Sequence, residues 1–211
     1  MKRAKVGDVY AVKVPNGYKL YQWAYSIPKK GDYIRVFPGL YEEIPENVAE
    51  IAAGPHQYII SFYSSRAYRI GLAQRIDNFP VPDEYPFPDY MFRFSQDMKG
   101  RIFRITLTGT KGTLGDWASF DVSHMKDLPP QYRDIKLVNS SVTPNWLLYL
   151  FDINFDLSDL TRFYPGLPGE DFAAKVQKYT DIVEEALERD RARREQSRIS
   201  RQAKKAGHPN E

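Results

Sequence analysis

Apolar and polar residues alternate along much of the first 63 residues, a pattern typical of half-buried β-strands. The Asn16-Gly17 pair stands between two such runs, and it favours a tight hairpin whose two central residues take positive φ. Residues 43–54 interrupt the alternation and read as a helix or a loop. The predicted strands of this part are residues 6–14, 18–27, 32–41 and 56–63. The first three form a meander.

The same alternation predicts strands at residues 100–109 and 115–122, joined by a glycine-rich hairpin loop. Residues 145–157 also alternate, and we expect Asp152, Asn154 and Asp156 to share the solvated face of a strand. Its apolar face would carry Leu147, Tyr149, Phe151, Ile153, Phe155 and Leu157. The fold class predicted is mostly β (α+β), a small twisted antiparallel sheet or partial barrel with a long C-terminal helix.

The C-terminal segment changes from a period of two to helical spacing. Its apolar positions are Phe172, Val176, Tyr179, Val183, Ala186 and Leu187. We therefore expect two parts: a β-rich globular domain at residues 1–168, and a helix at residues 169–211 whose apolar stripe docks as far as about residue 187. Residues 170–188 carry six acidic and two basic residues, and residues 189–205 carry eight basic and two acidic residues. The basic end is predicted to project from the body or to fray.

Residues 78–94 combine prolines with aromatic residues. Pro80, Pro82, Pro86 and Pro88 lack a backbone N–H, so they cannot join a central sheet. Their spacing does not match the Pro-x-x-Pro pattern of a linear ligand. We expect this segment to be a stiff, extended crossing of the surface.

Composition narrows the chemistry further. The chain has no cysteine, which excludes disulfides, iron–sulfur clusters and thiol nucleophiles, and favours the cytoplasm. The N-terminus has no signal-peptide pattern, and no apolar run is long enough to span a membrane. Residues 109–115 lack the Gly-Lys-Ser/Thr order of a phosphate-binding loop, and residues 152–163 lack the glycine and final carboxylate of a calcium loop. The sequence predicts no cofactor.

Two kinds of function remain open on the residues alone. His56, His124 and His208 are not at metal-ligand spacing, although a small hydrolase using His124 or His56 is an alternative, with Ser123 beside His124. The basic C-terminal helix suggests a nucleic-acid-binding β-barrel module or a module for an acidic partner. It has no aromatic residue beyond residue 181 to stack on bases.

The stretches "KVGDVYAVKVPNG" and "YKLYQW", with the proline-aromatic segment and "GRIFRI", resemble the immunity protein 26 family of bacterial polymorphic toxin systems. This resemblance covers roughly the first half of the chain. It implies a mostly-β, non-enzymatic, cytoplasmic protein that binds and neutralises a cognate toxin domain. Rigid aromatic residues would then anchor the toxin, and arginines of the C-terminal helix would steer it. The partner-binding residues predicted are Tyr85, Phe87, Tyr90, Trp117, Arg191, Arg194 and Arg198.

Overall fold

The structure is a computed structural model that describes residues 4–28, 31–96, 102–109, 117–120, 130, 137–141, 143–157 and 170–206. Within these residues nine strands form one sheet, in the order β5-β1-β2-β3-β4-β9-β6-β7-β8. The strands are β1 Asp8–Val14, β2 Gly17–Ile27, β3 Gly31–Val36, β4 Tyr58–Ser61, β5 Gln74–Asn78, β6 Tyr90–Gln96, β7 Ile102–Gly109, β8 Trp117–Phe120 and β9 Leu137–Ser141. The helices are α1 Val48–Ala53, α2 Ser64–Ile70, α3 Pro144–Asp152 and α4 Glu170–Ala206.

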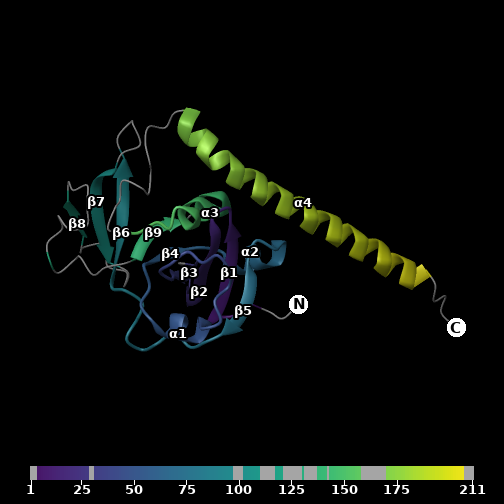
Figure 1. Ribbon diagram of the computed structural model, residues 1–211, viewed down its shortest axis with the longest axis horizontal. Coiled ribbons are helices and arrows are strands. Elements are labelled where there is room, and N and C mark those ends of the chain that lie inside the picture. Colours follow the sequence, from purple (N-terminus) through teal and green to yellow (C-terminus); the bar gives the residue numbers. More distant parts are fainter. Residues whose placement is uncertain are drawn as a thin grey trace.

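The five strands β5, β1, β2, β3 and β4 pair antiparallel, and β9 then pairs parallel with both β4 and β6. The predicted α+β class with a long C-terminal helix is confirmed, and so is the meander of β1 to β3. The sheet is open and does not close into a barrel. Figure 1 shows α3 lying between the sheet and α4, with α4 crossing one side of the molecule.

The first hairpin forms where predicted, but its turn is different. Val14 pairs with Gly17, so Pro15 and Asn16 are the turn residues and Gly17 begins β2. Asn154 is the one non-glycine residue with positive φ in the described part of the chain, so Asn16 has a negative φ. Gly17 has a φ of 141°, and a Cβ there would lie 2.4 Å from the carbonyl oxygen of Tyr41. The glycine is needed for this close approach rather than for the turn.

β1 is buried on both faces, because helices cover both sides of the sheet. Tyr10 and Val12 belong to the larger core, which also contains residues of α2, α3 and α4, while Val9 and Ala11 belong to a second core beneath α1. Consecutive side chains of a strand point to opposite faces, so both sets must be apolar. This explains the nearly continuous apolar sequence of the strand.

The prediction of a strand at residues 145–157 is wrong. Residues 144–152 form α3, with Pro144 in its first turn after an extended Thr143. Proline there loses no helical hydrogen bond and has the φ that a helix needs. Residues 147–151 are all buried. A strand with one solvated face would have exposed every second one of them. A short continuous apolar run is compatible with either element, and the proline decides for the helix.

The predicted solvated face of that strand is therefore also wrong. Asp152 is only 5% exposed, and its carboxylate accepts hydrogen bonds from the backbone N–H of Asn16 at 2.8 Å and the hydroxyl of Tyr179 at 2.6 Å. It also accepts one from Nζ of Lys178 at 3.2 Å. Asp152 thus joins the β1–β2 turn, the end of α3 and the first half of α4. Asp156 is exposed, as predicted.

α4 extends over 37 residues, and its burial changes along its length. Val176, Tyr179 and Ala186 are buried, and Asp190 is also buried at 6% exposure. Every residue from 191 to 202 is exposed. Among the described residues, no helix combines the length and apolarity needed to cross a bilayer.

Candidate functional site

The proline-aromatic segment is divided between two strands and the connection between them. Asn78 ends β5 and Tyr90 begins β6, and we call residues 79–89 the strap. All four prolines lie in the strap and outside the sheet, which confirms that part of the prediction. The backbone N–H of Tyr85 donates to the carbonyl of Pro82 at 3.0 Å, so the strap turns sharply in its middle.

The aromatic rings of the strap pack against the sheet. Phe87 lies edge-on to Tyr25 and Tyr33, with ring centroids 5.2 Å and 5.0 Å apart. The hydroxyl of Tyr25 donates to the carbonyl oxygen of Tyr85 at 2.5 Å. Tyr85, Phe87, Tyr25 and Ile27 all remain partly exposed. We call these four residues the strap cluster; they combine a fixed position with accessible apolar surface.

A buried arginine lies beneath the strap. Arg35 of β3 is 0% exposed, and its guanidinium carbon is 4.6 Å from the ring centroid of Tyr85. Its N–H groups donate to Gln22 Oε1 at 2.9 Å, the Gly54 carbonyl at 2.8 Å and His56 Nδ1 at 3.3 Å. These acceptors are neutral, and burial lowers the pKa of Arg35. A desolvated cation over an aromatic face is worth about 2 kcal/mol, so Arg35 helps to hold Tyr85 in place.

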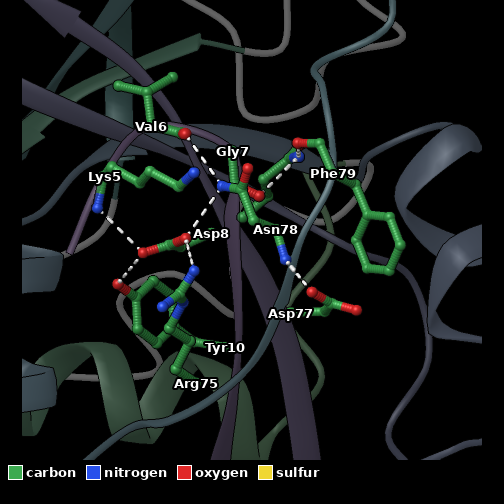
Figure 2. Close-up of polar contacts among 10 residues, drawn as sticks. Lys5, Val6, Gly7, Asp8, Tyr10, Arg75, Asp77, Asn78 and Phe79 are labelled. Carbon is green, nitrogen blue, oxygen red and sulfur yellow. Dashed lines mark hydrogen bonds and ion pairs between the residues drawn. The ribbon is translucent and has the colours of Figure 1, made fainter. Parts of the chain in front are cut away.

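Just before the strap, β5 is tied to the N-terminal segment by a buried carboxylate. Asp8 of β1 is 0% exposed, and it accepts hydrogen bonds from the backbone N–H of Lys5, the hydroxyl of Tyr10 and the side-chain amide of Asn78. Arg75 of β5 completes the group with an ion pair of 2.8 Å. Figure 2 shows the Asp8 carboxylate surrounded by these donors. Burial, with the charge of Asp8, raises the pKa of Tyr10.

Gly7 allows the strap to approach this group. The backbone N–H of Phe79 donates to the carbonyl of Gly7 at 3.0 Å, and Gln22 Nε2 donates to the carbonyl of Phe79 at 2.8 Å. Gly7 has a φ of 92°, and a Cβ there would lie 2.7 Å from both Asn78 Nδ2 and the Phe79 oxygen. Only glycine fits without moving the strap. Gln22 also accepts a hydrogen bond from Arg35, so it connects the start of the strap at Phe79 with the buried arginine.

The structure brings only some of the predicted partner-binding residues together. Tyr85 and Phe87 both contact Tyr25 in the strap cluster. Tyr90 and Trp117 begin β6 and β8, and their side chains lie outside the part that the structure describes. The predicted arginines, Arg191, Arg194 and Arg198, are all exposed in the second half of α4.

Arg194 and Arg198 belong to a groove between α2 and α4. It has a volume of about 790 Å³. Its lining residues are Arg69, Asp190, Arg193, Arg194, Ser197, Arg198, Arg201 and Gln202. Arg191 does not line it. We call this feature the arginine groove.

The residues required by the hydrolase alternative are only partly described. His56 is 9% exposed, its Nδ1 accepts the hydrogen bond from Arg35, and its ring lies edge-on to Tyr85 at 5.3 Å. His56 thus has a structural role beneath the strap. Ser123 and His124 lie outside the described residues. Among the residues that are described, no three His, Asp or Glu side chains gather in a way that could hold a metal ion.

Sequence reasoning missed that the charged residues Arg35, Asp8 and Asp190 are buried at these two surfaces. Each is a charged residue in a segment that is otherwise apolar or at an apolar position of the helical period. A charge at such a position is rarely buried without partners, and this was the available signal. The distant partners of Arg35 and Asp8 could not be identified from sequence, whereas Asp190 pairs with Arg193 and Arg194, three and four residues further along the same helix.

Comparisons of the chain with protein-family models, curated proteins and solved structures found no match. The fold is α+β, with a mixed open sheet and a long C-terminal helix.

Proposed function

We propose that this chain is an immunity protein that acts in the cytoplasm, where it binds a cognate bacterial toxin domain stoichiometrically and neutralises it. The observation that carries the proposal is the strap cluster. It presents partly exposed aromatic and aliphatic side chains on a backbone that prolines, the hydrogen bonds of Phe79 and Tyr85, and Arg35 hold in place. The resemblance of the first half of the chain to the immunity protein 26 family supplies the kind of partner.

A surface of this type suits tight binding to a protein. Aromatic side chains at the centre of an interface contribute about 2 kcal/mol or more each when they act as hot spots. Tyr85 and Phe87 have already lost their conformational freedom in the free protein, because they contact Tyr25, Tyr33 and Arg35. Less entropy is therefore lost on association.

The remaining predicted residues have secondary roles in the proposal. Tyr90 and Trp117 would extend the apolar contact beyond the strap cluster. Arg191, Arg194 and Arg198 would steer an acidic toxin face toward the protein, which raises the association rate at low salt. The proposed mechanism is occlusion of the toxin and needs no catalytic step.

The direct test is co-expression with the toxin domain encoded in the neighbouring reading frame. We expect the intact protein to restore growth and to co-purify with the toxin at a ratio of one to one. Loss of both effects would refute the proposal.

The binding face is tested with Tyr85→Ala and Phe87→Ala. Each is expected to weaken the toxin complex by roughly 30-fold, which corresponds to about 2 kcal/mol. Tyr63→Ala is the matched control, because Tyr63 is 61% exposed and lies at the start of α2, outside the strap cluster. Thermal melts of the free variants separate weaker binding from loss of the fold. Equal affinities for all three variants would place the interface elsewhere.

A further inference from the structure

The face of α4 that packs against the body continues beyond the body with different residues. Val176, Tyr179 and Ala186 form its buried part. At the same spacing of three or four residues, the positions that follow are Asp190, Arg193, Ser197 and Arg201. The helical period therefore continues, but the apolar stripe becomes a polar and cationic one.

The arginine groove lies where this change occurs. Asp190 is held at 2.6 Å by both Arg193 and Arg194, and Arg193 also donates to the backbone carbonyl of Arg69 in α2 at 2.6 Å. The hydrogen bond from Arg193 lowers the pKa of Asp190, so its carboxylate stays ionised. These contacts fix the orientation of two guanidinium groups at the base of the groove.

The groove has a large excess of positive charge. Five arginines line it, and Asp190 is the one carboxylate among its lining residues. Arg198 is paired with Glu195 at 2.7 Å, but Arg69 and Arg201 make no ion pair within the described part of the chain. Two of the five arginines are therefore unpaired among the described residues, and the five arginines together with Asp190 and Glu195 leave a net charge of +3 for an anionic ligand.

We propose that the arginine groove binds the phosphate backbone of a double-stranded nucleic acid. All eight lining residues are charged or polar. Protein–protein interfaces have an apolar or aromatic centre, whereas nucleic-acid interfaces are more polar and much more positive. The groove also has no aromatic lining residue on which the bases of a single strand could stack.

The shape of α4 agrees with this ligand. Its exposed part from residue 191 to 202 is about 18 Å long at 1.5 Å per residue, and Figure 1 shows it extending past α2, away from the sheet. A duplex can therefore lie along the exposed part of the helix. Arginine suits this role, because its planar guanidinium binds phosphate oxygens through two hydrogen bonds.

The test measures binding of the full chain to a fluorescent 20-base-pair DNA duplex between about 50 and 200 mM salt. If three or four phosphates are neutralised, log Kd is expected to change with log salt with a slope of about 3. The groove variant combines Arg194→Gln, Arg198→Gln and Arg201→Gln. It is expected to weaken binding at least 10-fold at low salt and to remove most of the slope, because each contact contributes about one unit.

The matched control combines Lys13→Gln, Arg66→Gln and Arg189→Gln. It removes the same charge from exposed positions that do not line the groove. Both variants change only exposed side chains, and thermal melts check that they fold. Equal weakening by the control and the groove variant would overturn the proposal, since binding would then depend on net charge alone.

Two further probes distinguish the class of ligand. A single-stranded 20-mer is expected to bind more weakly than the duplex, and polyglutamate of matched charge is expected to bind more weakly still. Polyglutamate binding that equals or exceeds duplex binding would overturn the proposal and would assign the groove to an acidic protein. These experiments contain no toxin, so their outcome is independent of the proposed immunity function.

Discussion

The two halves of α4 share one helix but differ in how they relate to the body. The first half buries Val176, Tyr179 and Ala186 and contacts the Asp152 carboxylate. The second half, beyond Asp190, carries most of the basic residues of the helix, and its residues 191–202 are exposed. The difference teaches that helical propensity alone makes a long helix, whereas docking requires an apolar stripe and a buried acceptor that the stripe can reach.

The largest loss of stability is expected from Asp152→Ala, which removes the hydrogen bonds that hold the first half of α4 on the body. It leaves the hydroxyl of Tyr179 and the backbone N–H of Asn16 without their acceptor in a buried site. We expect the free energy of unfolding to fall by about 3 kcal/mol. Denaturant unfolding measures it, with Asp181→Ala as the exposed control. Equal stability of the two variants would show that Asp152 does not anchor α4.

A second prediction concerns Lys19, which ties the segment after α3 to the sheet. Its ammonium is buried and donates to Asn154 Oδ1 and Gln57 Oε1, both at 2.6 Å, and to the Gly39 carbonyl at 2.8 Å. Burial lowers the pKa of Lys19 to about 7. Between pH 7 and the ordinary lysine pKa of about 10.4, the unfolded chain binds more protons than the folded one, so stability rises with pH.

We therefore expect the free energy of unfolding of the wild type to rise by about 2 kcal/mol from pH 7 to pH 9, relative to Lys19→Met. Lys13→Met is the matched control on the neighbouring strand, because Lys13 is exposed. The control should follow the wild type. Parallel pH profiles for Lys19→Met and the wild type would contradict the lowered pKa. Measurements stay below pH 9.5, where tyrosines begin to ionise in the unfolded chain.

Tyr179→Phe measures how much the single hydrogen bond between Tyr179 and Asp152 contributes to the docking of α4. The variant removes the donor but leaves Asn16 and Lys178 on the Asp152 carboxylate. A hydrogen bond to a charged group is worth about 1.5 kcal/mol, so we expect the free energy of unfolding to fall by that amount. This loss is smaller than the one expected for Asp152→Ala. Tyr63→Phe, at an exposed ring, is expected to be neutral. A loss as large as that of Asp152→Ala would mean that the ring had moved.

The smallest effect is expected from truncation after Arg194, which removes most of the exposed half but keeps Asp190 and Arg193. The deleted residues up to 202 are exposed, so we expect a change of less than about 0.5 kcal/mol in the free energy of unfolding. Truncation after Leu187 should cost more, because it also deletes the Arg193 contact with α2. A large loss from the shorter deletion would show that the exposed half packs on the body.

Local patterns predicted much of this fold. The strands of the meander, β4, β7 and β8 overlap the segments where alternation placed them, because strand period and turn residues are local properties. Local patterns failed at residues 145–157, where the apolar run alone fits a helix or a strand and the helix signal, Pro144, lies just before it. They also missed the seven-residue α2, to which the second half of α4 binds.

The sequence by itself determined the α+β class, the proline-rich connection outside the sheet and the change from an acidic to a basic C-terminal segment. These features follow from composition and short-range spacing. Only the tertiary structure decided that Arg35 lies beneath Tyr85, that Asp8 ties the end of β5 to the N-terminal segment and that Asp152 positions α4. The physical reason is that a buried charge is stable only with partners, and folding brings these partners from distant parts of the chain.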